Sequence, residues 1–450
     1  MGLVVISLLF IIWMDYLMLG HNLSRPSFLY VLGFFICSIV AYSWKTEWDL
    51  HTLSPTTAFL LIGGAILFFV VELLYSRCHP MKRRYTGIEY DNNFVPIKCK
   101  KLYIFLILQI AVYCVVAKAK MQQASLASTL AESLLEANND KKFNGIFSQL
   151  PFYINSPYVF CQDIGFIWCA LLPYYQMKSK LFRKQKLLIA CNFIVCLLGS
   201  FLSAGRMPMF NYIVSYFSFL YISYQFKSRW KNGLLPKKYS ILILGGCITF
   251  VLFFNQLGYV IGRQEDDRLS TSALIAMYCG AEIKNLDDAI KYPATNNKDN
   301  LFAQYTLSTL YNHIALRLNP KSPKLYGPPS EFNHVNGFYL GNVYTTYYNY
   351  WLDFGCLGLV CVVLVAFFMS FFYHKMINST FWFDGRLSLW ICIYSYMSVV
   401  SFLSFFSEQF FGHLPILVII RMPVYWLLVS IYLQGHKRCY YKKIQAIVYN

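Results

Sequence analysis

Long runs of apolar residues, separated by shorter polar stretches, recur along almost the whole chain. A run of about 20 apolar residues folded as a helix crosses a hydrocarbon core of about 30 Å. The pattern predicts an all-α integral membrane protein that forms one polytopic domain over residues 1–450. The eleven predicted transmembrane spans lie near residues 2–19, 28–44, 57–76, 102–117, 158–176, 187–203, 207–226, 240–261, 347–373, 387–406 and 413–434.

Two of the polar stretches are long enough to hold structure of their own, at about 118–157 and 262–346. Prolines interrupt the second stretch, so its helices should be short and should lie on the membrane bundle. Apolar residues at helical spacing predict one such helix near 307–318, with His313 and Arg317 along one edge of its apolar stripe. Similar spacing near 126–134 predicts an interfacial helix in the first stretch.

The composition supports a membrane protein and raises a question about charge. Hydrophobic residues make up 57% of the chain, aromatic residues 19% and charged residues only 13%, which is not the composition of a soluble protein. Lysine and arginine number 39 against 21 acidic residues, a formal net charge of +18. In a soluble chain such a charge would suggest nucleic-acid binding, so the location of the charges decides what they mean.

Sorted by loop, the charges alternate from one side of the predicted bundle to the other. The loops on one side, with the C-terminal tail, hold 24 basic and three acidic residues, whereas the opposite loops hold 14 of each. Because cytoplasmic loops carry the excess of lysine and arginine, the N-terminus should face outward and the C-terminus the cytoplasm. The two long stretches then become outer loops. The excess charge is a topology signal drawn to anionic membrane lipid, and no nucleic-acid partner is predicted.

Known cofactor and metal motifs are missing from the chain. None of the fourteen cysteines stands in a CxxC pair, and the Walker A, GxGxxG and HExxH patterns are absent. The sequence therefore predicts neither a cofactor nor a metal ion.

Four arginines at the outer side or within a span are candidate anion ligands. Arg206 follows a glycine in the turn Ser-Ala-Gly-Arg-Met-Pro at 203–208, where a guanidinium can bind an anion bidentately or extend to lipid headgroups. Arg263 is followed by three acidic residues, so local ion pairing is as plausible as ligand binding. Arg317 lacks such neighbours. Arg421 lies inside the last predicted span, where it must face a cavity or a partner such as Asp163.

Residues 331–358 form an unusually polar and aromatic stretch. His334 and Glu331 are candidates to accept a proton, because a histidine titrates near neutral pH and a partly desolvated glutamate can do so as well. Aromatic rings and amides at this density are suited to stacking on sugar rings and bonding their hydroxyls, although an interfacial aromatic belt accounts for some of them. The candidate glycan-binding residues are Asn336, Asn342, Tyr344, Tyr347, Trp351 and Asp353.

Taken together, these features resemble the Wzy-type polymerases of O-antigen and capsule repeat units. The resemblance covers the many spans and the large late outer loop, and it rests mainly on the SxGR turn at 203–206 and on Asn-Val-Tyr-Thr leading to Asp-Phe-Gly-x-x-Gly within 342–358. The stretch around Arg317 has no clear counterpart in the family pattern.

The resemblance implies a metal-independent, inverting glycosyltransferase in the bacterial inner membrane. Such an enzyme polymerises undecaprenyl-diphosphate-linked oligosaccharides into lipopolysaccharide O-antigen or capsular polysaccharide at the periplasmic face. Arg206, Arg317 and also Arg263 or Arg421 would bind the departing diphosphate, while His334 or Glu331 would deprotonate the acceptor hydroxyl. Expected partners are membrane lipid, a chain-length regulator and a flippase.

Two alternatives remain open at this point. O-antigen ligases share the topology and an outer-loop histidine, and they would transfer finished glycan to lipid A core. A lipid-linked oligosaccharide flippase is the alternative from another class. Transporters usually place charged residues along a midplane path and show related halves, and neither feature is evident here, so the sequence favours an enzyme.

Overall fold

The structure is a computed structural model of the chain, which folds into two compact units that we describe separately. Unit 1 comprises Met1–Lys82, Leu269–Ile377 and Met397–Arg421, and unit 2 comprises Arg83–Arg268, Asn378–Tyr396 and Met422–Asn450. The described residues are 1–80, 97–123, 129–139, 150–178, 182–203, 205, 207–228, 230, 233–260, 270–293, 301–318, 327–329, 333–379, 381–383 and 386–433.

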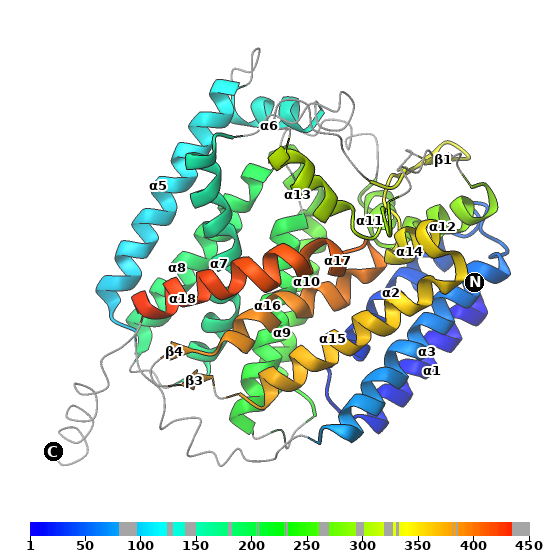
Figure 1. The fold of residues 1–450 in the computed structure, drawn as a ribbon, viewed down its shortest axis with the longest axis horizontal. Helices are drawn as coiled ribbons and strands as arrows, with labels where there is room; N and C mark the ends of the chain where they lie inside the picture. The colour runs from blue at the N-terminus through cyan, green and yellow to red at the C-terminus, as the bar shows by residue number, and fades with distance from the viewer. Residues whose placement is uncertain are drawn as a thin grey trace. The chain divides into compact units, whose positions relative to one another are not determined.

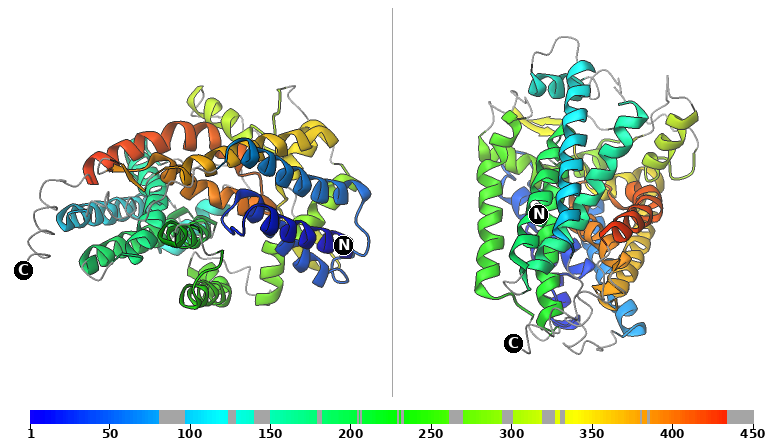
Figure 2. Two further views of the ribbon diagram at one scale, coloured as in Figure 1. Left: turned by 90° about the horizontal axis from the view of Figure 1, so that it is seen from below. Right: turned by 90° about the vertical axis from the view of Figure 1, so that its left-hand side faces the viewer.

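Four long helices of unit 1 form a bundle (Figures 1 and 2). The first three contact one another, and the fourth packs along the third and also touches the second. These helices are α1 Gly2–Met18, α2 Pro26–Ser43, α3 Pro55–Cys78 and α15 Leu359–Ile377.

The start of α3 shows how local sequence positions this bundle. The Oγ of Ser54 accepts a hydrogen bond from the backbone N–H of Thr57 at 3.0 Å, and Pro55 occupies the first helical turn, where no backbone donor is needed. Further along, Gly64 allows α3 to approach Tyr347 closely, because a Cβ at this position would overlap the tyrosine hydroxyl. A larger residue at position 64 would force the ring or the helix to move.

The remainder of unit 1 consists of short elements that pack on this bundle. The first two short helices contact α2, and the hairpin formed by the two strands contacts both of these short helices. In chain order the elements are α11 Thr271–Cys279, α12 Ala281–Lys291, α13 Ser308–Leu318, β1 Asn333–Val335, β2 Phe338–Gly341, α14 Thr346–Phe354, the 3-10 turns η5 Gly355–Gly358 and η6 Leu403–Phe405, α17 Phe410–His413 and the π-helix η7 Leu414–Arg421.

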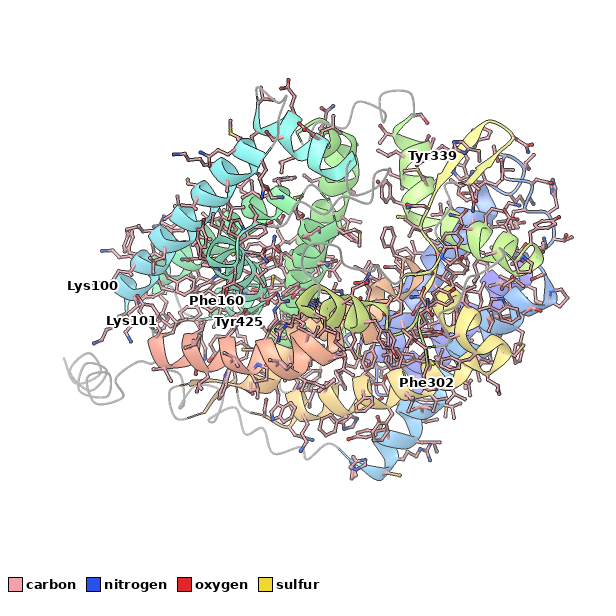
Figure 3. The ribbon with its side chains drawn as sticks, turned by 45° about the horizontal axis from the view of Figure 1, so that its top comes forward. Lys100, Lys101, Phe160, Phe302, Tyr339 and Tyr425 are labelled. Atoms are coloured by element: carbon pink, nitrogen blue, oxygen red, sulfur yellow. The ribbon has the colours of Figure 1, made fainter. Side chains whose placement is uncertain are left out.

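Unit 2 is organised around α7, which contacts α5, α8, α9 and α18. Phe160 of α7 and Tyr425 of α18, both labelled in Figure 3, meet edge to face with their ring centroids 4.9 Å apart. The elements are α5 Cys99–Gln123, α6 Leu130–Asn139, α7 Phe152–Gln176, α8 Arg183–Ser200, η3 Phe201–Ser203, α9 Met207–Ser228, α10 Lys237–Val260, β3 Trp382–Phe383, β4 Arg386–Leu387 and α18 Met422–Leu433; α16, Leu389–Phe402, begins in unit 2 and ends in unit 1.

The helices agree with the prediction of an α-helical, multi-pass membrane protein. Each of the eleven predicted spans overlaps a helix, and the segments Gly2–Met18 and Leu389–Phe405 are apolar but shorter than a full span. The number eleven therefore stays a prediction. Within the described part of the chain, six segments are long and apolar enough to cross a membrane: Pro26–Ser43, Pro55–Cys78, Cys99–Gln123, Arg183–Ser203, Thr346–Ile377 and Phe410–Leu433.

The helix α1 is apolar on both of its faces. Val4, Leu8 and Ile11 are buried in the bundle at helical spacing, while Leu3 and Ile6 are 73% and 66% exposed. A soluble protein would place polar residues on the exposed face, whereas lipid accepts an apolar one. This side of α1 is suited to contact with lipid chains.

The predicted loop helices are confirmed, but the large loop is not purely helical. The helix predicted near 307–318 is α13, and α6 covers the C-terminal part of the helix predicted near 126–134; residue 126 itself lies outside the described residues. The loop also contains the β1–β2 hairpin, which the sequence analysis did not predict. A short helix and a short hairpin each satisfy the backbone of a few residues, so the prolines alone do not exclude strands.

A buried carboxylate on α12 ties the short helices to the start of α3. The Oδ1 of Asp287 accepts hydrogen bonds from the Ser54 N–H at 2.8 Å and the Thr57 hydroxyl at 2.7 Å, and its Oδ2 lies 2.6 Å from the Nζ of Lys291. Burial alone would raise the pKa of Asp287, but the bonds from Lys291, Ser54 and Thr57 outweigh it and lower the pKa below the ordinary value of 3.8.

We therefore expect Asp287 to make the fold sensitive to acid. Because its folded pKa is lowered, it stabilises the protein above the unfolded pKa, and this contribution is lost as the pH falls through the folded pKa. Asp287→Asn should cost about 1.5–3 kcal/mol at pH 7 and should flatten the fall in melting temperature between about pH 5 and pH 3. Asp49→Asn, at an exposed position before α3, is the control and should change little. Equal acid sensitivity in Asp287→Asn and the unmutated protein would contradict the assignment.

Candidate functional site

Two short helices that are distant in the chain, α13 and α17, pack on one another in unit 1. Figure 1 shows them side by side. The contact is close, since a Cβ at Gly412 of α17 would lie 3.1 Å from the hydroxyl of Thr309 on α13. His313 lies one helical turn after Thr309 on the same face, and His413 directly follows Gly412. The junction therefore gathers polar residues from the large loop and from the start of the last predicted span.

Two of the arginines predicted to bind an anion affect the pKa of the same histidine at this junction. Partial burial, followed by the positive charges of Arg421 and Arg317, lowers the pKa of His313 below its ordinary value of 6.5. Such an effect requires the charged groups to be near one another. Arg317 is exposed and Arg421 is half-buried. The fold thus brings Arg317 and Arg421 together around a histidine that is mostly neutral at pH 7.

The π-helix η7 determines the position of Arg421. This eight-residue element ends at Arg421 and contains Pro415, which lacks the backbone N–H that a continuous α-helix would use. π-helical segments are rare and occur frequently at functional sites. His413, just before η7, lies within electrostatic range of both Arg421 and His313. Two guanidinium groups beside two imidazoles offer the donors that a phosphate or diphosphate requires.

A half-buried carboxylate lies at the base of the same junction. The Oε1 of Glu408 accepts a hydrogen bond from the N–H of Phe411 at 2.7 Å, and its Oε2 accepts one from the N–H of Gly412 at 2.9 Å. The hydroxyl of Tyr350 on α14 donates to Oε1 at 3.5 Å. Burial raises the pKa of Glu408 to about 7, although these hydrogen bonds oppose the change.

The hairpin displays the predicted catalytic histidine on its exposed side. His334 on β1 is the cross-strand neighbour of Tyr339 on β2, with ring centroids 4.9 Å apart. The two-residue turn is formed by Asn336 and Gly337, whose φ angles of 51° and 80° are both positive, as the twist of a tight hairpin requires. The side chain of Asn336 donates to the carbonyl of Glu47 at 3.4 Å, which anchors the turn to the segment after α2.

Asn285, which is fully buried on α12, holds the base of the hairpin. Its Nδ2 donates to the carbonyl of Val343 at 2.8 Å, and its Oδ1 accepts from the side chain of Asn333 at 2.9 Å. Asn333 also donates to the hydroxyl of Tyr344 at 3.2 Å, and the Tyr344 ring stacks on Tyr348 at 4.2 Å. Tyr344, predicted to contact glycan, is therefore largely occupied by internal contacts.

Two of the predicted glycan-binding residues have structural positions that do not fit that role. Tyr347 is 1% exposed and its hydroxyl bonds to that of Tyr30 on α2 at 2.8 Å, so its ring belongs to the core. The carboxylate of Asp353 accepts hydrogen bonds from the N–H groups of Tyr305 and Thr306, the latter at 2.7 Å, and thereby fixes the turn before α13. Sequence reasoning gave both residues to a glycan surface because it could not tell which side of α14 faces the bundle.

The other predicted site residues fall into two groups. Asn342 and Trp351 are half-buried near the start of α14 and within it. Arg206, Arg263 and Glu331 lie outside the described residues. Within unit 1, the hairpin with Tyr339 lies apart from α13 and α17 in Figures 1 and 3, so His334 is not part of the arginine and histidine junction.

Some functional candidates were missed by the sequence analysis although the sequence held a signal for them. Glu408 stands directly before an apolar run that begins at Phe410, a common position for an acidic residue at the start of a helix. Asn336-Gly337 between β-favouring residues is a strong hairpin signal. Asn285 gave no signal, because one asparagine in an amphipathic helix does not reveal whether it faces the core.

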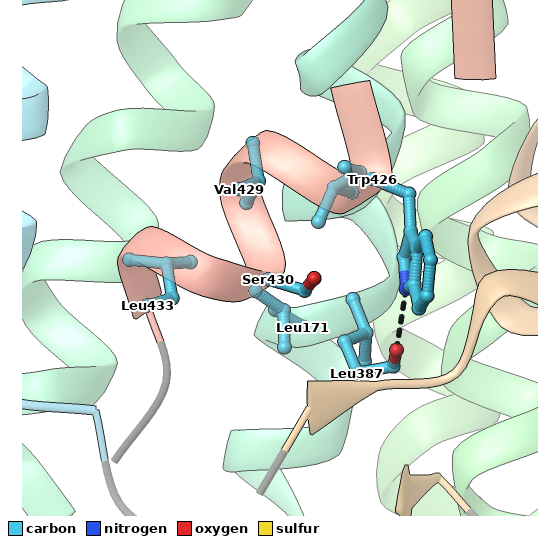
Figure 4. A pocket seen from close by; sticks show the side chains of 7 residues that line it. Leu171, Leu387, Trp426, Val429, Ser430 and Leu433 are labelled. Carbon is cyan, nitrogen blue, oxygen red and sulfur yellow. Dashed lines mark hydrogen bonds between the residues drawn. The ribbon is translucent and has the colours of Figure 1, made fainter. Parts of the chain in front are cut away.

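A small pocket in unit 2 has a different chemical character (Figure 4). Side chains of α7 and α18 line it together with Leu387, and the indole N–H of Trp426 donates to the carbonyl of Leu387 at 2.5 Å. The lining is apolar except for Ser430 and carries no charged side chain. The pocket is therefore unsuited to a diphosphate.

Comparison with known proteins yields no relative. The chain matches no protein-family model, no curated protein and no solved structure. In the part of the chain that the structure describes, no three His, Cys, Asp or Glu side chains are grouped so that they could hold a metal ion.

Proposed function

We propose that the protein polymerises undecaprenyl-diphosphate-linked oligosaccharide repeat units into O-antigen or capsular polysaccharide. The observation that carries the proposal is the junction of α13 and α17, where Arg317 and Arg421 act together on His313. Glycosyl transfer from a lipid diphosphate releases a highly charged leaving group. Two arginines that both lie within electrostatic range of one histidine are suited to stabilise that charge without a metal ion.

The proposed reaction is a direct, inverting displacement. An acceptor hydroxyl attacks the anomeric carbon of the lipid-linked sugar as the bond to the diphosphate breaks. Arg317 and Arg421 would hold the leaving diphosphate, with Arg206 and Arg263 as further ligands from outside the described residues. A proton acceptor is also required, and the sequence candidates for it are His334 and Glu331.

The hairpin is the proposed contact surface for the glycan. His334 is exposed on this hairpin and its ring is tilted by 52° against that of the half-buried Tyr339, and an imidazole and a phenol can bond and stack against sugars. Asn336, Asn342 and Trp351 are the remaining glycan-binding candidates near this surface.

The proposal includes an orientation in the membrane. Eleven spans, an outward N-terminus and a cytoplasmic C-terminus would direct the large loop to the periplasmic side of a bacterial inner membrane, where lipid-linked repeats are polymerised. A flippase and a chain-length regulator are the proposed protein partners.

A reconstituted assay tests this function directly. Purified protein in lipid nanodiscs is supplied with lipid-linked repeat units extracted from a strain that lacks it, and the products are separated on a gel. We expect a ladder of polymer lengths, and His334→Ala and Arg206→Ala should abolish it while leaving protein levels normal. Transfer of preformed long glycan to lipid A core without any ladder would identify a ligase instead. Single lipid-linked repeats retained on the cytoplasmic side in the deletion strain would indicate a flippase.

A further inference from the structure

Glu408 combines two features that suit a group that exchanges a proton. It is half-buried, and both of its oxygens are held in place by the backbone N–H groups of Phe411 and Gly412. A carboxylate fixed in this way keeps one orientation, which a group that exchanges a proton with a substrate requires. Asp353 is also half-buried and held by backbone N–H groups, but its donors belong to the turn before α13, whereas those of Glu408 belong to α17.

Glu408 is connected to that junction through α17. Gly412, which donates to Glu408, contacts Thr309 on α13 and is followed by His413. Thr309 precedes His313 by one turn on the same helix face. The carboxylate is therefore tied to the α17 side of the junction, whereas Arg317 belongs to α13 and Arg421 to the end of η7.

This separation suits a direct displacement. The attacking hydroxyl and the leaving diphosphate are on opposite sides of the anomeric carbon, so the proton acceptor must stand apart from the cations that hold the diphosphate. Burial, backbone N–H groups and Tyr350 determine the titration of Glu408, whereas the arginines act on His313. The two halves of the reaction thus have separate electrostatic environments.

We propose that Glu408 is the proton acceptor for the attacking sugar hydroxyl. This inference rests on the proposed function. In the step, the hydroxyl oxygen forms a bond to the anomeric carbon, its proton passes to a carboxylate oxygen of Glu408, and the bond between the anomeric carbon and the diphosphate oxygen breaks. The electron pair of that bond leaves with the diphosphate, beside Arg317 and Arg421. Glu408 replaces His334 in this role, and His334 remains on the glycan surface.

The titration of Glu408 agrees with this role. A pKa raised to about 7 leaves the carboxylate partly ionised at neutral pH and strengthens it as a base. The titratable groups that face it from other elements are Tyr350 of α14 and Cys361 of α15. The ordinary pKa values of tyrosine and cysteine lie above neutral pH, so neither side chain would make the rate increase with pH near pH 7. Such an increase, the rising limb of the pH–rate profile, would come from Glu408.

The test is the pH dependence of polymerisation by Glu408 variants in the nanodisc assay. The unmutated protein should show a rate that rises through about pH 7, because only the ionised carboxylate accepts a proton. Glu408→Gln should lower kcat by about 10²–10⁴-fold with little change in KM, and the remaining activity should lack the rising limb. Glu408→Asp should retain the limb at a reduced rate. Glu132→Gln is the matched control, since Glu132 also accepts a backbone N–H at the start of a helix, and it should be neutral.

A second variant keeps the test decisive if Glu408→Gln fails to fold. Tyr350→Phe removes a hydroxyl that donates to the ionised form, so the rising limb should move to higher pH. A merely structural Glu408 would leave the position of the limb unchanged in Tyr350→Phe, and that result overturns the proposal. Near-normal kcat in folded Glu408→Gln overturns it too. Failure of the unmutated protein to make any ladder would refute the proposed function itself.

Discussion

If the proposed function holds, Arg421→Ala should lower the rate of polymerisation by about 10²–10³-fold, because it removes a cation proposed to stabilise the departing diphosphate. Arg317→Ala should have an effect of the same order. The double variant should lose less than the product of the two single losses, since groups that stabilise one charge act together. Arg421→Lys should recover only part of the activity, because an ammonium keeps the charge but cannot bond bidentately. Initial rates from the nanodisc assay measure all four effects.

The matched control for these variants is Arg77→Ala. Arg77 is an exposed arginine at the end of α3, so its removal tests whether loss of any arginine harms the protein. We expect unchanged rates for it, together with normal melting temperatures for the folded single variants. A loss of less than about tenfold in both Arg317→Ala and Arg421→Ala would exclude this junction as the diphosphate site.

The sequence predicted the helices well because their apolar pattern is long and repeated. It also selected Arg317 and Arg421 as anion ligands, but from separate local arguments. Their convergence on His313 depends on the packing of α13 against α17, which no local pattern encodes. The effect of Arg421 also depends on a π-helix, and the position of Pro415 within an apolar run did not reveal it.

The sequence was a poor guide to which polar and aromatic residues face a ligand. Tyr347 and Tyr344 lie in the same stretch as the half-buried Asn342 and Trp351, yet one is in the core and the other is stacked on Tyr348. Successive side chains on a helix point about 100° apart, so composition alone does not show which of them face the core. Glu408 was counted only as an outer charge, because its burial arises from contacts with α14 that are remote in sequence.

The second large effect concerns stability. It involves Arg25, one of the basic residues in the loops predicted to face the cytoplasm. Arg25 is 3% exposed, and one of its guanidinium nitrogens lies 3.2 Å from Oε1 of Glu72 and donates to the Ser76 hydroxyl at 2.8 Å. The other oxygen of Glu72 accepts the N–H of Ser27 at 2.7 Å. Asp15 of α1 is also fully buried, within electrostatic range of Arg25 and Glu72. The guanidinium of Arg25 therefore pairs with Glu72 and also lies within electrostatic range of Asp15.

Arg25→Ala should accordingly destabilise the protein by about 3–5 kcal/mol, because it leaves buried acidic groups without their cation. Unfolding by SDS in mixed micelles measures this loss as a free energy. Arg77→Ala again provides the control, since an exposed arginine on the neighbouring helix should contribute about 0–1 kcal/mol. Activity of the surviving folded protein should remain near normal, because Arg25 contacts Glu72, Ser76 and Tyr373, which belong to α3 and α15 and not to α13 or α17.

A double variant separates the ion pair from simple loss of packing. If the cost of Arg25→Ala comes from the unpaired carboxylate, then Arg25→Ala combined with Glu72→Gln should be more stable than Arg25→Ala alone, since the amide carries no charge. If the cost comes from the lost alkyl chain of Arg25, the second substitution should add to the damage. Recovery in the double variant would mean that this arginine is retained for a buried pair, and that the positive charge of a loop predicted to be cytoplasmic does not always determine membrane orientation.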